Sequence, residues 1–181
     1  MKPRTAVLAL VVSVLAGSSL ADSSPISYAG QQTRSIKALS EEDITALLNA
    51  EGMGMAKPAE LNGYPGPKHV LTLAKELKLT EAQRQQVQGI FDQMSAAARP
   101  LGMEIIGREV LLDRLFAKGE MTPDRLAVET AAIGTLEGSL RSVHLAAHLQ
   151  TRALLNADQV ALYNGLRGYD SPSAPHDHHH H

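Results

Sequence analysis

Two short stretches of this 181-residue chain carry the same signal for the start of a helix. Residues 79–83 read LTEAQ and residues 155–159 read LNADQ, so each places a leucine, a capping residue and a glutamine at the same spacing. Thr80 and Asn156 can accept hydrogen bonds from the free N–H groups of a first turn, and the glutamine can reach back to the cap. Between the two starts, apolar residues recur every three or four positions, which is the period of a helix. We therefore expect an all-α fold.

The residues between the two starts predict a long antiparallel helical hairpin. A continuous apolar stripe predicts one long helix that is bent but not broken at Pro100. Residues 117–124 read as a turn, and the apolar residues of the following helix, which ends near Leu154, recur every seven positions. Such a repeat favours antiparallel packing of the second helix on the first. Short flanking helices are expected over residues 68–78 and 157–167.

The paired starts resemble the LTxxQ motifs of the Spy/CpxP family of periplasmic proteins, and the residues that carry the resemblance are Leu79, Thr80, Gln83, Leu155, Asn156 and Gln159. The second copy has asparagine where the family has threonine, which keeps the capping chemistry. The resemblance covers residues 68–169. It implies a Spy/CpxP-like hairpin that forms a homodimer, in a family that includes envelope-stress chaperones and heavy-metal sensors and resistance proteins.

The amino-terminal residues have the composition of an export signal. Residues 1–21 combine two basic residues, an apolar run and a small-residue cleavage site, which predicts a secretory signal peptide and a periplasmic location. The apolar run is too short to span a bilayer comfortably, so no stable membrane span is expected after cleavage.

The remaining chain divides into three expected parts. Residues 22–67 should be flexible apart from one short helix, Glu41 to about Glu51, and the glycine- and proline-rich end of this part reads as a loop. Residues 68–170 should form the LTxxQ-type helical domain. Residues 171–181 should be a disordered histidine-rich tail.

The composition narrows the possible functions. The chain has no cysteine, so thiolate metal sites and cysteine nucleophiles are excluded, and any metal must be held by His, Asp, Glu, Met or backbone atoms. A formal net charge of −2 does not give the clearly basic face that nucleic-acid binding needs. Ser139 and Ser142 lie near His144 but lack the strand and turn that present a nucleophilic serine, so we expect no enzyme.

Two histidines are the first candidates for metal ligands. His144 and His148 are four residues apart, so on a helix their side chains share one face and could share an ion. A buried histidine bonded to a backbone carbonyl is the alternative interpretation, and both stay open. The pair is not the HExxH motif of a metalloprotease, because Leu145 stands where that motif has glutamate. A first-row ion needs further ligands, for which His69 and Asp92 are candidates.

The family resemblance implies a similar set of ligands. The nickel and cobalt sensors of this superfamily use histidines from the helix before the first LTxxQ-like start, an acidic residue from the long helix, and a histidine from the helix before the second start. His69 and His144 fall close to those positions, and His148 stands where the sensors carry a methionine. The acidic ligand aligns nearer Phe91 than Asp92, and the second early histidine is missing.

Two further groups could bind metals. His176, His178 and His179 belong to a terminal run that can chelate Ni(II), Zn(II) or Cu(II), either as a native tail or as an expression tag. Met53 and Met55 could be thioether ligands for Cu(I). Flexible loop methionines are the favoured interpretation, because no third sulfur or nearby histidine accompanies these two in the sequence.

The leading hypothesis is a non-catalytic periplasmic protein that binds Ni, Co, Cu or Zn and acts in heavy-metal sensing or resistance or in the envelope stress response. The alternative is an ATP-independent chaperone that holds unfolded clients, or a stress-signalling inhibitor, with no role for metal. Residues 68–118 contain eight basic and six acidic residues, and residues 119–170 contain four basic and six acidic residues. Long-range electrostatic attraction of unfolded clients would therefore be weak. Expected partners are a second copy, an envelope signalling protein or unfolded clients, and no nucleic acid.

Overall fold

The computed structural model describes residues 28–169, which fall into two compact units that divide after Gln32. A short 3-10 helix, η1 (Gln31–Thr33), includes the division, and residues 33–169 form the helical body. The predicted signal peptide and the tail, with the candidate ligands His176, His178 and His179, lie outside the described residues.

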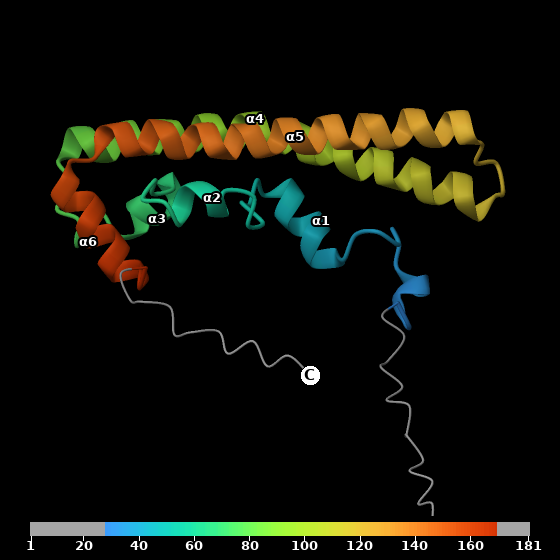
Figure 1. Ribbon diagram of the computed structural model, residues 1–181, viewed down its shortest axis with the longest axis horizontal. Coiled ribbons are helices and arrows are strands. Elements are labelled where there is room, and N and C mark those ends of the chain that lie inside the picture. The colour runs from blue at the N-terminus through green and yellow to red at the C-terminus, as the bar shows by residue number, and fades with distance from the viewer. Residues whose placement is uncertain (1–27, 170–181) are drawn as a thin grey trace, which may run out of the picture. The chain divides into compact units, whose positions relative to one another are not determined.

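The helical body is built on two long antiparallel helices, α4 (Glu81–Ala117) and α5 (Pro123–Leu154), which lie side by side in Figure 1. Thr80 and Thr122 cap them, each with its side-chain oxygen accepting from the backbone N–H three residues on. Helix α4 continues through Pro100 without a break. The prediction of an all-α fold with a long hairpin and short flanking helices is therefore confirmed.

The flanking helices are α1 (Glu41–Leu48), α2 (Lys57–Glu60), α3 (Pro67–Thr72) and α6 (Ala157–Arg167). Figure 1 shows them on one side of the hairpin. Helix α2 lies within the stretch predicted to be a loop, and that prediction is wrong for these 4 residues. Pro58 occupies the first turn of α2, where its fixed φ fits a helix and its missing N–H is not needed.

Two of the flanking helices end earlier than the sequence predicts. Helix α1 ends at Leu48, before the predicted Glu51, because Ala50 adopts a left-handed φ of 55°. Helix α3 ends at Thr72, and the chain then follows tight turns to Lys78, whose φ is 49°. These turns lead into the cap of α4.

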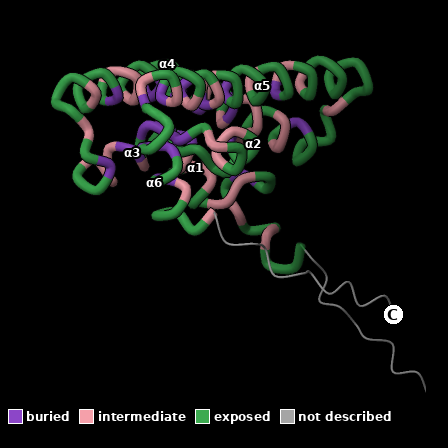
Figure 2. Tube along the Cα trace, turned by 60° about the vertical axis from the view of Figure 1, so that its left-hand side comes forward, coloured by how far each residue is buried: buried purple, intermediate pink, exposed green. Residues whose placement is uncertain are grey.

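Two apolar clusters hold the short helices on the hairpin. The first joins α3, α6 and the adjoining ends of the long helices, and consists of Val70, Leu77, Val87, Leu155, Val160 and Tyr163. The second joins α1 to the middle of the hairpin, and consists of Leu47, Ala50, Ala98, Ile105 and Leu140. Figure 2 shows buried residues alternating with exposed ones along both long helices, as expected of helices with one covered face.

Glycine allows α1 to lie directly on α4. A Cβ atom at Gly102 would lie 2.5 Å from the backbone oxygen of Leu47, closer than any real side chain is found. Gly102 is thus a packing site for α1.

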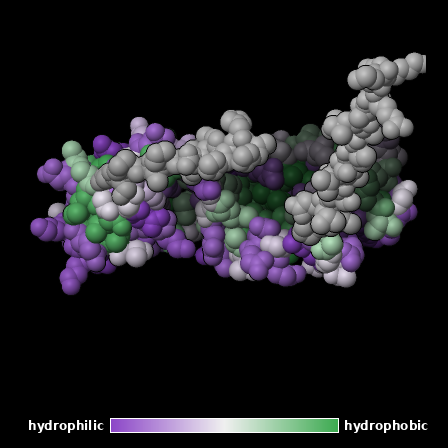
Figure 3. Space-filling model, turned by 60° about the horizontal axis from the view of Figure 1, so that its bottom comes forward, coloured by the Kyte–Doolittle hydropathy of each residue, from purple (hydrophilic) through white to green (hydrophobic). Residues whose placement is uncertain are grey.

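Apolar side chains also lie on the surface of the hairpin. Four of them are more than half exposed: Met103, Phe116, Val128 and Leu149. Figure 3 shows apolar surface in patches between polar side chains on the face drawn there. Within residues 28–169, none of the helices combines the length and the hydropathy needed to cross a bilayer.

Candidate functional site

The two LTxxQ-like motifs meet at one end of the hairpin and bond to each other. Gln83 Nε2 donates to Gln159 Oε1 over 3.0 Å, and Gln159 Nε2 donates to Gln83 Oε1 over 3.1 Å. Each amide oxygen also accepts from the backbone N–H of its own cap residue, and each amide nitrogen also donates to a backbone carbonyl, of Leu154 or of Leu77. Both capping boxes are therefore formed, and the pair fixes the start of α6 against the start of α4.

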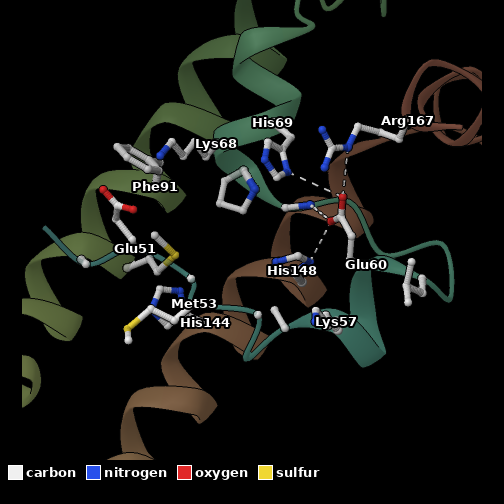
Figure 4. A pocket seen from close by; sticks show the side chains of 18 of the residues that line it. Glu51, Met53, Lys57, Glu60, Lys68, His69, Phe91, His144, His148 and Arg167 are labelled. Atoms are coloured by element: carbon white, nitrogen blue, oxygen red, sulfur yellow. Dashed lines mark hydrogen bonds and ion pairs between the residues drawn. The ribbon is translucent and has the colours of Figure 1, made fainter. Parts of the chain in front are cut away.

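A pocket of about 430 Å³ lies elsewhere in the helical body, and neither Gln83 nor Gln159 lines it. Its walls come from the segment 50–69, from α4, from α5 and from the end of α6. The three histidines selected from the sequence, His69, His144 and His148, all line it. Figure 4 shows them around the pocket, with His69 and His148 on the side of Glu60 and His144 on the side of Met53.

Glu60, at the end of α2, is the most heavily bonded side chain of the pocket. Its Oε1 accepts from the hydroxyl of Tyr163 over 2.5 Å and from that of Tyr169 over 3.0 Å, and its Oε2 accepts from the N–H of Gly66 over 3.2 Å. The Arg167 Nε lies 3.5 Å from Oε1. We call Glu60 with Tyr163, Tyr169 and Arg167 the Glu60 cluster; it joins α2 to the end of α6.

The Glu60 cluster keeps the carboxylate ionised. Burial raises the pKa of Glu60, but the hydrogen bonds from the two tyrosine hydroxyls, helped by the charges of His148 and His69, outweigh burial and leave the pKa below its ordinary value. Burial and the same carboxylate raise the pKa of Tyr163, so its hydroxyl stays a donor. A negative charge is thus held between two histidines at neutral pH.

A hydrogen bond to one ring nitrogen of His148 leaves the other ring nitrogen free to bind a ligand. Its Nδ1 lies 2.7 Å from the backbone oxygen of Tyr64, so in the neutral ring Nδ1 carries the proton and donates it to that carbonyl. The other nitrogen, Nε2, then has a free lone pair. This is the arrangement that orients histidine ligands in metal sites, where the distal N–H bonds to a carbonyl or carboxylate. The same Nδ1 is 3.7 Å from Glu60 Oε2.

A glycine makes room for the ring of His148. A Cβ atom at Gly66 would lie 2.8 Å from both Cε1 and Nε2 of the imidazole. Any other residue at this position would therefore displace the ring. Gly66, the residue directly before α3, thus provides space for a pocket side chain and also occupies the cap position of that helix.

His144 is a buried imidazole with an unsatisfied nitrogen. The residue is 3% exposed, and its Nε2 has no hydrogen-bond partner. Burial, and to a smaller extent the charge of His148, lowers the pKa of His144, so the ring is neutral near pH 7. A buried polar atom without a partner costs roughly 1–3 kcal/mol, which binding of a ligand at that atom would recover.

His69 lines the pocket, and its side chain is 44% exposed. Its Nδ1 is 3.6 Å from Glu60 Oε1. Burial lowers the pKa of His69, as does the charge of Arg167, and these effects outweigh the opposite influence of Glu60. His69 and His148 thus face different oxygens of one carboxylate, and within residues 28–169 no three His, Asp or Glu side chains are close enough together to hold one ion.

Asp92, the acidic ligand proposed from the sequence, is exposed on α4 and accepts a hydrogen bond from Gln88 over 2.9 Å. It does not line the pocket, whereas its neighbour Phe91 does. The carboxylates that line the pocket are Glu51 and Glu60, which the sequence interpretation did not select. Glu60 is the single acidic residue of the glycine- and proline-rich stretch 52–67, and that isolation is the signal that could have identified it.

Methionine sulfur also reaches the pocket. Met53, on the turn before α2, and Met94, on α4, both line it. Met53 is 43% exposed and has a φ of 46°, a left-handed conformation that costs roughly 1–2 kcal/mol for a residue with a Cβ. Met55 instead packs against the second apolar cluster. The two loop methionines therefore have different surroundings.

Comparison of the chain with protein-family models, with curated proteins and with solved structures gave no match.

Proposed function

We propose that this protein is a non-catalytic metal-binding protein of the periplasm, of the Spy/CpxP type, that acts in heavy-metal sensing or resistance or in the envelope stress response. The observation that supports the proposal is the convergence of His69, His144 and His148 on one pocket from α3 and α5. Imidazole suits Zn, Cu, Ni and Co, and a protein without cysteine has no thiolate to offer.

The donors fit such an ion in their chemistry. His148 has its tautomer set by Tyr64 and a free lone pair on Nε2, and His144 is a neutral ring with an unsatisfied buried nitrogen. Because burial lowers the pKa of His144, its ring does not need to lose a proton at neutral pH in order to bind an ion. His69 and the carboxylates of Glu51 and Glu60 supply further ligands once side chains close on the ion.

The Glu60 cluster provides a physical basis for a response. Glu60 joins α2 to the end of α6, and His69 and His148 both lie within 4 Å of its carboxylate. An ion drawn to these rings would bring positive charge beside the carboxylate and compete with Arg167 and the tyrosine hydroxyls for it. Binding would thereby change how α6 is held, and a change of this kind could be read by an envelope signalling partner.

Metal titration tests the proposal. The protein, with the five tail histidines replaced by serine, is titrated with Ni(II), Co(II), Cu(II) and Zn(II) while thermal unfolding is followed. An ion that binds the folded state stabilises it by about 2.7 kcal/mol at a concentration 100 times Kd, so the midpoint must rise. His144→Ala and His148→Ala should reduce the rise. Asp92→Asn is the matched control and should leave it unchanged, because Asp92 lies outside the pocket.

A chaperone is the second candidate, and the exposed apolar side chains of the hairpin favour it. Met103, Phe116, Val128 and Leu149 offer apolar contacts to an unfolded client. Suppression of the aggregation of a chemically denatured enzyme, lost on Phe116→Ser and Val128→Ser, would support this function. No rise in unfolding midpoint with any of these four ions or with Cu(I), together with such suppression, would reject the metal-binding proposal in favour of the chaperone.

A further inference from the structure

Soft donors line part of the pocket. Three residues that are distant in the sequence provide them: Met53 from the turn before α2, Met94 from α4 and His144 from α5. Figure 4 shows Met53 and His144 on the same side of the pocket, opposite the side on which Arg167 and Glu60 lie. The charges of Glu60 and Arg167 therefore lie apart from Met53 and His144.

We propose that His144, Met53 and Met94 form a binding site for a soft monovalent ion, Cu(I), in this pocket. The inference rests on the proposed function and names the class of ion that the pocket prefers. Thioether sulfur selects Cu(I) over the divalent first-row ions, which favour nitrogen and oxygen, and imidazole is a good copper ligand. The buried Nε2 of His144, which has no hydrogen-bond partner in the protein, is an independent observation that points to a ligand-binding atom there.

The apolar part of the pocket wall favours Cu(I) over a divalent ion. Figure 4 shows Phe91 on the side of Met53 and His144, together with the carboxylate of Glu51. Ala56 also lines the pocket and Met94 is 8% exposed, so apolar side chains make up much of the wall. A monovalent ion loses less hydration energy than a divalent ion on entering such a wall, because the desolvation cost rises with charge. Met53 is exposed and unbranched, so its sulfur can approach the ion without movement of α4 or α5.

The test measures the affinity of the protein for Cu(I) by competition with bicinchoninate, anaerobically, in the chain with the five tail histidines replaced by serine. We expect one Cu(I) per chain, and a loss of affinity of about 10- to 100-fold for each of His144→Gln, Met53→Leu and Met94→Leu. Met55→Leu is the matched control, because Met55 packs in an apolar cluster and does not line the pocket, and its affinity should equal that of the parent protein.

Spectroscopy supplies a second measurement. The chain has no cysteine, so any sulfur scattering in the X-ray absorption spectrum of the bound Cu(I) must come from methionine. The scattering should fall in Met53→Leu and Met94→Leu. Exchange of methionine for leucine in a packed position usually leaves the fold intact, and the unfolding midpoint of each variant without copper checks this.

The outcomes separate the inference from the function on which it rests. Unchanged Cu(I) affinity in both methionine variants, or a bound ion without sulfur scattering, overturns the inference. Histidine-dependent binding of a divalent ion without binding of Cu(I) overturns the inference and leaves the proposed function standing. Absence of binding by every ion tested rejects both.

Discussion

The substitution Glu60→Gln removes one negative charge from the pocket and keeps the shape of the side chain. Hydrogen bonds to a charged group contribute about 1.5–3 kcal/mol each, against about 0.5–1.5 kcal/mol for neutral pairs, so three bonds weakened by about 1 kcal/mol each cost about 3 kcal/mol. The contribution of Arg167 is small, because its side chain is 34% exposed and such pairs are screened by solvent. We expect a total loss of about 2–4 kcal/mol in the free energy of unfolding.

Urea unfolding at pH 7 measures this loss as a fall in the midpoint at constant m-value. Glu104→Gln is the matched control, since Glu104 is exposed on α4, and its effect should stay within about 0.5 kcal/mol. A double-mutant cycle with Tyr163→Phe should give a coupling of about 0.5–3 kcal/mol. A loss below about 1 kcal/mol for Glu60→Gln would refute the assignment of Glu60 as the residue that joins α2 to α6.

The pH dependence of stability is a second measurement on the same residue. The pKa of Glu60 is lower in the folded protein than its ordinary value of 4.5, so the unfolded chain binds the proton more tightly. The stabilisation is therefore present above about pH 4.5 and is lost as the pH falls through the folded pKa. Glu60→Gln should flatten the stability profile in that acid range, and an unchanged slope there would contradict the proposed hydrogen bonds.

Three further predictions follow from the other contacts. Gln83→Ala and Gln159→Ala should each cost about 1–3 kcal/mol, and the double variant should lose less than the sum, because either change already breaks the shared bonds; additive losses would refute the pairing. Gly102→Ala should lower the free energy of unfolding by about 1–3 kcal/mol, because the new Cβ clashes with α1. Gly107 has open space around it, so Gly107→Ala should raise the free energy of unfolding by about 0.5–1 kcal/mol in the same urea assay. His144 has a pKa below 6.5, so stability should fall as the pH drops from 6.5 toward that pKa, and His144→Gln should remove this part of the slope in a pH series of thermal unfolding.

Much of the fold could be predicted because its signals are local. A capping box involves residues three positions apart, and both Thr80 with Gln83 and Asn156 with Gln159 form one. The apolar period of the hairpin is likewise readable over one or two helical turns. The end of α1 was harder to predict, because it depends on the left-handed conformation of Ala50. Alanine is not a residue type that indicates this conformation.

The site could be predicted in part. The spacing of His144 and His148 identified two residues of the pocket, since four positions on a helix place them on one face. Glu60 escaped prediction because its tyrosine partners are 103 and 109 residues away in the sequence. The residues that line the pocket together with Met53 could not be predicted for the same reason. His144 and Met94 do line this pocket, but they come from α5 and α4. Contacts between distant segments depend on packing that no local pattern encodes.

The hydrogen bonds between the two motif glutamines restrict how the length of the hairpin can vary. They join positions 76 residues apart at one end, while the connection between α4 and α5 lies at the other. An insertion in one arm alone would shift one amide along its helix by 1.5 Å per residue and break the pairing. Equal insertions beside the connection would leave the amides in register, so relatives with longer or shorter hairpins should differ by matched numbers of residues in the two arms.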